Sequence, residues 1–115
     1  MHELSIAINI VEIAEEEAQR RGGLHVTAVH LRLGLLAGVV KDALLSSYGV
    51  ACEDTPLRGS RLVVEEVPGI VYCPTCAAGR PVRSSEWFCC SECGSIASEI
   101  VQGKELEVVS LEVEE

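Results

Sequence analysis

The sequence predicts an α+β protein in which two helices pack on a three-stranded sheet and a four-cysteine module is inserted into that body. Three observations lead to this prediction. Apolar residues near the start of the chain recur at helical spacing, and three later segments alternate apolar and polar residues as half-buried strands do. Two C-x-x-C pairs lie between the last two of those segments. A chain of 115 residues can bury one modest core and carry a small appendage.

Residues 4–21 are predicted to form an amphipathic helix that Gly22-Gly23 ends, because glycine readily adopts the positive φ of a helix C-terminus. Glu16 with Arg20, and Glu17 with Arg21, should form ion pairs on its outer face. The expected apolar stripe consists of Leu4, Ile8, Val11, Ala14 and Ala18, widened by Ile6, Ile10 and Ile13.

The strands are predicted at residues 24–35, 61–67 and 105–113, the last with a break in its alternation at Val109-Ser110. A short helix is expected over residues 40–48, ended by Gly49. The strands before and after the cysteine pairs are expected to pair with each other. The domains would then be a body of residues 1–69 and 103–115 and a module of residues 70–102 at the tip of a long hairpin.

Composition excludes several classes of function. The net charge of −9 argues against a nucleic-acid partner, since phosphates require an excess of Lys and Arg. The N-terminus lacks a basic region before its apolar residues, and no apolar run is long enough to span a bilayer, so neither an export signal nor a membrane segment is expected. A reducing, cytoplasmic location fits the thiols. No catalytic motif is visible, so an enzyme is not expected.

Cys73, Cys76, Cys90 and Cys93 form the two C-x-x-C pairs. Each pair can donate two thiolates from a tight turn, and four thiolates in a closed tetrahedron suit Zn²⁺, so a zinc-ribbon-like module is predicted. Iron in the same site, two disulfides and a redox-active thiol pair are the alternatives. A closed four-thiolate site has no open coordination position and therefore holds the fold without doing chemistry.

Two cysteines stand outside these pairs. Cys52 is expected to be a small, partly buried hydrophobic residue. Cys89 could compete as a ligand, but Cys90 has the correct spacing to Cys93 and is preferred. Trp87-Phe88 should pack on the thiolates and limit their access to solvent. His25 and His30 are interpreted as solvated or hydrogen-bonded histidines.

His2 has a different position, directly after the terminal residue. The terminal amine, the backbone nitrogen of His2 and its imidazole can bind one ion through fused five- and six-membered chelate rings. With the amide proton lost, these donors are planar and strong-field, which suits Ni(II) or Cu(II) better than tetrahedral zinc. Glu3 adds a neighbouring carboxylate, although chain termini are commonly frayed and solvated.

Together these residues resemble the HypA/HybF family of hydrogenase nickel-incorporation proteins, over nearly the whole chain. The resemblance is carried by the two C-x-x-C pairs and by four further segments. These segments are Met1-His2-Glu3-Leu4-Ser5-Ile6, Val29-His30-Leu31-Arg32-Leu33-Gly34, Leu62-Val63-Val64-Glu65 and Gly103-Lys104-Glu105-Leu106. Cys52 and Cys89 do not belong to the family pattern, and no histidine flanks either cysteine pair.

The resemblance implies a nickel metallochaperone that delivers Ni²⁺ for maturation of [NiFe]-hydrogenase. It implies His2 as the principal nickel ligand, assisted by the Met1 amine and Glu3, and a structural Zn²⁺ on Cys73, Cys76, Cys90 and Cys93. The implied partners are a HypB-type GTPase and the hydrogenase large subunit, with urease maturation proteins for some members. No membrane partner is expected, and the protein would be a monomer or a homodimer.

Two rival functions follow from the cysteines alone. The first is a zinc-ribbon protein-interaction module that transports no metal, in which His2 and the terminal amine are dispensable. The second is a thiol redox enzyme, which requires a reactive, low-pKa thiolate and activity without zinc.

Overall fold

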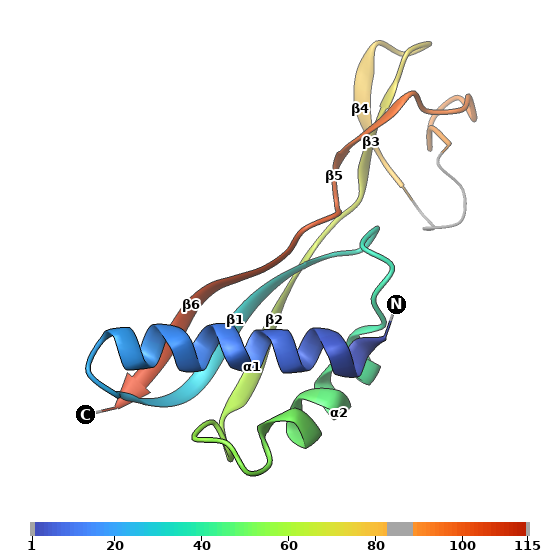
Figure 1. The fold of residues 1–115 in the computed structure, drawn as a ribbon. Coiled ribbons are helices and arrows are strands. Elements are labelled where there is room, and N and C mark those ends of the chain that lie inside the picture. The colour runs from blue at the N-terminus through green and yellow to red at the C-terminus, as the bar shows by residue number, and fades with distance from the viewer. Residues whose placement is uncertain (1, 83–88, 115) are drawn as a thin grey trace. The chain divides into compact units, whose positions relative to one another are not determined.

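A computed structural model of the chain describes residues 2–82 and 89–114 (Figure 1). Its strands form two three-stranded sheets, one in the order β2-β1-β6 and one in the order β4-β3-β5. The predicted α+β class, with two helices, is confirmed. In chain order the elements are α1 (Glu3–Arg20), β1 (His25–Gly34), α2 (Lys41–Cys52), β2 (Arg61–Val67), β3 (Ile70–Cys73), β4 (Ala78–Pro81), β5 (Glu99–Gln102) and β6 (Leu106–Glu114).

The residues group into two compact units. The first unit comprises Met1–Leu31, Val39–Glu65 and Glu107–Glu115, and the second comprises Arg32–Gly38 and Glu66–Leu106. The first unit therefore contains both helices, and the second contains the sheet β4-β3-β5 and the two cysteine pairs.

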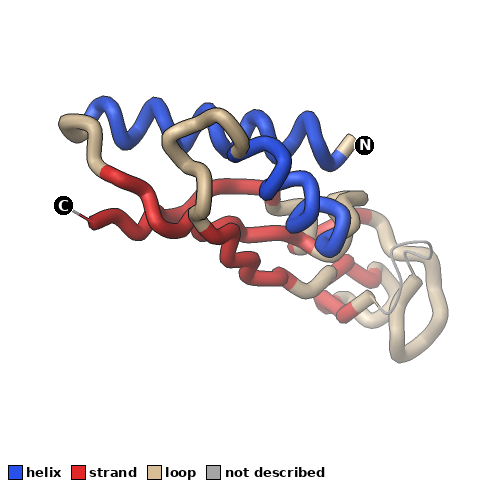
Figure 2. Tube along the Cα trace, turned by 90° about the horizontal axis from the view of Figure 1, so that it is seen from below, coloured by secondary structure: helices blue, strands red, loops and turns tan. Residues whose placement is uncertain are grey.

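The first unit is two-layered, with both helices on one face of its strands (Figure 2). Its helix α1 begins and ends within one residue of the prediction, and Gly22 and Gly23 follow it with positive φ. The predicted apolar stripe is partly wrong, because Leu4 and Ile8 are more than two-fifths exposed. The small side chain of alanine allows close packing of α1, and the buried residues are Ala7, Ile10, Val11, Ala14 and Ala18.

Helix α2 continues four residues beyond its predicted end, through Gly49. Glycine inside a helix costs about 1 kcal/mol relative to alanine, but packing offsets this cost. Leu44, Tyr48 and Cys52, spaced four residues apart, are all buried on one face of α2. The Tyr48 hydroxyl also lies 2.7 Å from Ser60 Oγ, which ties α2 to the loop before β2. Cys52 belongs to the hydrophobic core as expected, but it is buried more completely than predicted, with 3% of its surface exposed.

The predicted pairing of the strands before and after the module is wrong, because β1 lies between β2 and β6. The burial of the three strands explains this order. Most residues of β1 are buried, whereas β2 and β6 are mainly exposed or half-buried. The most buried strand therefore occupies the centre. The glutamate-rich β6 is at the edge, where charge discourages pairing with other chains.

In the second unit, two segments of backbone approach closely at Gly34. The Gly34 nitrogen donates to the Glu105 carbonyl at 2.7 Å, and the Leu36 nitrogen donates to the Gly103 carbonyl at 2.7 Å. A Cβ atom at Gly34 would lie 2.0 Å from the Gly103 carbonyl oxygen. Only glycine fits at this position, which explains its place in the sequence.

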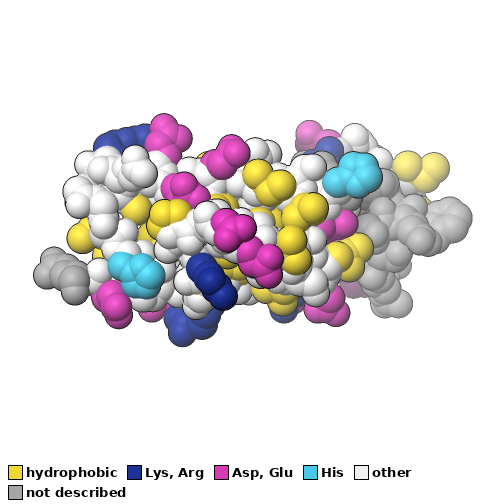
Figure 3. All heavy atoms as spheres, turned by 60° about the horizontal axis from the view of Figure 1, so that its bottom comes forward, with side chains coloured by type: hydrophobic (Ala, Val, Ile, Leu, Met, Phe, Trp, Pro, Cys, Tyr) yellow, Lys and Arg dark blue, Asp and Glu magenta, His cyan; other side chains and the backbone are white. Residues whose placement is uncertain are grey.

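Within the described residues, no helix has the length and apolar character needed to cross a membrane. The surface reflects the net charge of −9, since acidic side chains lie among apolar ones on the face that Figure 3 presents. The histidine side chains visible on that face lie far apart.

Candidate metal centre

The second unit brings together the four cysteines of the C-x-x-C pairs. Their Sγ atoms all lie within 4.8 Å of one another, and we call this group the four-cysteine cluster. Sγ of Cys73 is 3.5 Å from that of Cys93, and Sγ of Cys76 is 3.8 Å from that of Cys90. The Zn–S distance of a tetrahedral site places its sulfurs about 3.8 Å apart. The donor set therefore fits zinc, and no disulfide is formed by any of the six cysteines.

The first C-x-x-C pair lies in the turn between β3 and β4. Cys73 is the last residue of β3, and Ala77 has a φ of +54°, which turns the chain sharply back into β4. The backbone nitrogen of Cys76 lies 3.4 Å from Cys73 Sγ and donates to it. Such N–H groups stabilise thiolates and fix the orientation of the ligand side chain.

The second pair repeats this arrangement outside a regular strand. The Cys90 nitrogen donates to the Ser95 carbonyl at 2.8 Å, and Gly94 adopts a φ of +76° that closes the turn. The Glu92 nitrogen donates to Cys90 Sγ at 3.4 Å, and Ser95 Oγ lies 3.3 Å from Cys93 Sγ. The contribution of Ser95 was not foreseen from the sequence, although its position two residues after Cys93 is a usable signal.

Without metal, these thiols differ in proton affinity. Hydrogen bonds to Cys93 and Cys73 raise the pKa of Cys76 to about 12. Hydrogen bonds from the Ser95 side chain and backbone lower the pKa of Cys93 to about 6. A divalent cation binds all four as thiolates, so binding must release protons and strengthens as pH rises.

The remaining cysteines lie outside the four-cysteine cluster. Cys89 is half-buried and pairs with Ile96 in an isolated β-bridge. Cys52 belongs to the core of the first unit. Trp87-Phe88, expected to cover the sulfurs, lies outside the described residues.

His2 and Glu3 lie at the start of α1 in the first unit. His2 is the N-cap residue, with an extended backbone, an exposed side chain and no side-chain capping hydrogen bond. The Glu3 carboxylate accepts a hydrogen bond from the Val40 nitrogen at 3.3 Å, at the N-terminus of α2. Met1, the third predicted nickel ligand, lies outside the described residues.

The other histidines match their interpretation. His25 is exposed at the first position of β1. His30 Nε2 lies 2.7 Å from Glu112 Oε2, and Arg61 donates to the same oxygen at 3.2 Å. These three side chains belong to β1, β6 and β2, so they link the three strands of the first sheet.

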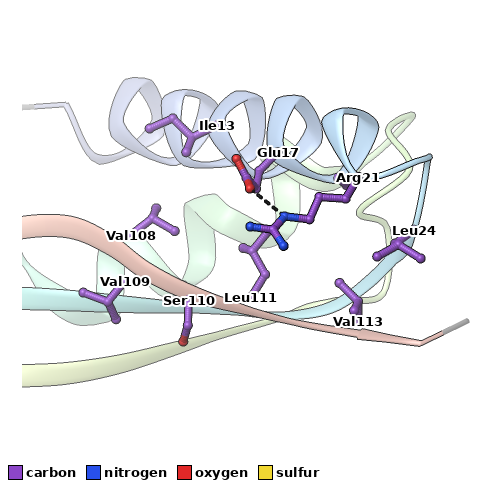
Figure 4. A pocket seen from close by; sticks show the side chains of 10 residues that line it. Ile13, Glu17, Arg21, Leu24, Val108, Val109, Ser110, Leu111 and Val113 are labelled. Carbon is purple, nitrogen blue, oxygen red and sulfur yellow. Dashed lines mark hydrogen bonds and ion pairs between the residues drawn. The ribbon is translucent and has the colours of Figure 1, made fainter.

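A cavity of about 500 Å³ lies between α1 and β6 in the first unit (Figure 4). Val108, Leu111 and Val113 point toward α1, whereas Ser110 turns away, as the predicted break in alternation requires. The polar side chains directed into it are those of the ion pair of Glu17 and Arg21, 2.9 Å apart. The lining contains no histidine or cysteine, so it does not contribute to either metal-ligand group.

Comparison with known proteins agrees with these features. Residues 1–113 match the family model described as "Hydrogenase/urease nickel incorporation, metallochaperone, hypA". A hydrogenase maturation factor HypA of Chloroflexus aurantiacus is 51% identical over 97% of this chain and 98% of its own length. A HypA of Geobacter metallireducens is 45% identical over 99% of this chain and 100% of its own length.

The fold agrees as well. The solution structure of the Ni metallochaperone HypA from Helicobacter pylori matches with a TM-score of 0.67 at 23% identity, covering 98% of this chain and 97% of that one. The fold and the four-cysteine cluster thus define a small metal-binding protein of the α+β class. The chain belongs to the HypA family of nickel-incorporation metallochaperones, which are maturation factors, and the resemblance predicted from the sequence is confirmed.

Proposed function

We propose that this protein binds Ni(II) at its N-terminus and delivers it for the maturation of [NiFe]-hydrogenase. The ligands are the Met1 amine and the His2 amide nitrogen and imidazole, with the Glu3 carboxylate assisting. The observation that supports this proposal most is the position of His2, which is exposed at the start of α1 and bears no capping hydrogen bond. A cargo ion must be held where a partner's ligands can replace those of the carrier, and an exposed chelate meets this need.

The donor set determines what the site can select. One amine, one deprotonated amide and one imidazole form a planar, strong-field set suited to Ni(II). Cu(II) should bind the same donors at least as tightly, because affinities follow the Irving–Williams order. Nickel selectivity must therefore come from the metal supply and from partner recognition.

Glu3 links this site to the fold. One carboxylate oxygen is hydrogen-bonded to Val40 at the N-terminus of α2, a position that also favours negative charge through the helix dipole. The second oxygen is the one available to nickel. In this arrangement Glu3 restrains the neighbouring His2, whose side chain stays exposed.

Zinc has the opposite role in our proposal. Cys73, Cys76, Cys90 and Cys93 hold one Zn²⁺, which occupies all four tetrahedral positions with sulfur and stabilises the second unit. The support is the fit of the sulfur spacing and the N–H donors directed at Cys73 and Cys90. The zinc is resident, whereas the nickel is cargo.

Partners follow from the family. We propose that a HypB-type GTPase and the hydrogenase large subunit take part in delivery, and that urease maturation proteins are further candidates. The six free cysteines suit a reducing cytoplasm.

Nickel titration of the zinc-loaded protein tests the N-terminal site. His2→Ala should lose most of its nickel affinity, and His25→Ala, which removes another exposed histidine of the first unit, should bind as the wild type does. Equal affinity and stoichiometry in wild type and His2→Ala would refute the site. The same result would favour a zinc-ribbon interaction module.

A further inference from the structure

Arg80 lies on the same face of the small sheet as the first ligand cysteine. In the antiparallel pair of β3 and β4, Cys73 is opposite Ala78 and Val71 is opposite Arg80. Directly opposite side chains share a face of a sheet, and so do alternate residues of one strand. The Arg80 side chain therefore leaves β4 on the side occupied by Cys73, whose side chain is fully buried.

The guanidinium of Arg80 is close to the four-cysteine cluster. The Arg80 side chain is hydrogen-bonded to Cys76, and the Cys90 thiol and the Glu92 carboxylate lie nearby. Arg80 Nε is buried and has no hydrogen-bond partner in the described part of the chain. A buried donor of a charged group is costly to leave unpaired, so a nearby anion would stabilise it.

Each of the four sulfurs has a hydrogen-bond partner besides the other sulfurs. Cys73 receives the Cys76 N–H, and Cys90 receives the Glu92 N–H. Cys93 lies beside the Ser95 hydroxyl. The remaining sulfur, that of Cys76, is the one hydrogen-bonded to Arg80. Arg80 thus completes a set of donors around the cluster.

The charge of the loaded site explains why a cation is useful there. Four thiolates and one Zn²⁺ carry a formal charge of −2, in a chain whose net charge is already −9. Removing this charge from water is unfavourable unless opposite charge or hydrogen-bond donors compensate it. A guanidinium supplies both, since it is permanently charged and carries several N–H donors.

We propose that Arg80 is a positioning residue of the zinc site that donates to the Cys76 thiolate and offsets the negative charge of the loaded four-cysteine cluster, which slows zinc release. This inference rests on the proposed zinc occupancy. It gives the resident ion an electrostatic restraint in addition to its four ligands. Partners of metal ligands commonly change metal affinity by about 10- to 100-fold when removed.

The test compares zinc release from wild type, Arg80→Gln, Arg80→Lys and the control Arg58→Gln, which removes an exposed arginine of the first unit. Elemental analysis gives the zinc content, and a chromophoric chelator in excess gives the release rate. Arg80→Gln should release zinc about 10- to 100-fold faster, Arg80→Lys should fall between it and wild type, and Arg58→Gln should match wild type. In Co(II)-substituted protein, loss of the donor to Cys76 should shift the sulfur-to-cobalt charge-transfer band to lower energy.

The outcomes separate this inference from the proposal it rests on. Wild-type protein without zinc would refute the zinc site itself. Zinc-loaded Arg80 variants with wild-type release rates and an unshifted cobalt band would refute the role of Arg80 and leave the zinc site intact. Should Arg80→Gln fail to fold, Arg80→Lys provides the same two measurements while keeping the charge and the aliphatic stem.

Discussion

The two regions that we propose to bind metal differ in how their ligands are held. The four sulfurs of the second unit are fixed by turns, by backbone N–H donors and by burial of Cys73 and Cys90. The proposed nickel ligands of the first unit lie at the beginning of the chain. Of the two that the structure describes, His2 is exposed and Glu3 is hydrogen-bonded to the N-terminus of α2.

In our proposal, this difference allows one small chain to bind a structural ion and a transported ion at the same time. A site with every coordination position filled from within the fold exchanges its ion slowly, because partial unfolding must precede release. An exposed chelate can lose one ligand at a time to a partner. Accessibility of the ligands, rather than affinity alone, therefore separates a structural ion from a cargo ion.

The largest expected effect is at the sulfurs. Cys76→Ser should lose zinc and unfold the second unit, because the metal-binding free energy of structural zinc sites is on the order of 10 kcal/mol. Cys89→Ser is the matched control, since this cysteine is a neighbour of Cys90 but lies outside the four-cysteine cluster. Elemental analysis of both variants would measure their zinc content, and NMR would show whether the second unit is folded. A Cys89→Ser variant without zinc would contradict the ligand assignment.

A smaller effect, on the free energy of unfolding, is expected at Gly34, where two backbone segments approach closely. Gly34→Ala should lower the free energy of unfolding by about 1–3 kcal/mol, as overpacked sites do, because its Cβ would meet the Gly103 carbonyl. Gly49→Ala should instead raise it by up to about 1 kcal/mol, since Gly49 is inside α2 with open space around it. Urea denaturation of the two variants would measure these changes. Equal stability of Gly34→Ala and wild type would contradict the close approach of Gly34 to the Gly103 carbonyl.

The smallest expected effect concerns pH in the first unit. The hydrogen bond from His30, with help from Arg61, lowers the pKa of Glu112 below its ordinary value of 4.5. A carboxyl whose pKa is lowered by folding stabilises the fold above its unfolded pKa, and this contribution disappears as pH falls through the folded pKa. Glu112→Gln should therefore show a shallower loss of stability below about pH 4.5.

Glu114→Gln is the control for this pH effect, because it makes the same charge change on the same strand. Its stability should follow pH as that of the wild type does. Urea denaturation midpoints of the two variants and the wild type, measured between about pH 3 and pH 7, would test this prediction. If the stability of Glu112→Gln depended on pH as that of the wild type does, the proposed contribution of Glu112 would be refuted.

Local patterns in the sequence were sufficient for most of the elements. The strand predicted over residues 61–67 has these bounds in the structure, and α1 is shifted by one residue. Both depend on periodicity and on glycine, which act between neighbours in sequence. The C-x-x-C spacing likewise predicted which four sulfurs come together.

Properties that depend on distant residues were not predictable in the same way. The position of β1 between β2 and β6 follows from which strand buries most surface, and alternation within one strand does not reveal this. The strands of the second unit are four residues long, and β4 ends in Pro81, so their pattern is too short to detect. The bond between Glu3 and Val40 joins two elements whose contact no local pattern indicates.

The central claim is that the second unit keeps its ion while the N-terminus exchanges another. Native mass spectrometry of protein supplied with zinc and nickel, with a free N-terminus and with an N-terminal extension, tests it most directly. We predict one retained zinc in both forms and one additional nickel only in the form with the free N-terminus. Nickel bound equally by the extended form, or zinc lost together with nickel on mild chelation, would contradict the claim.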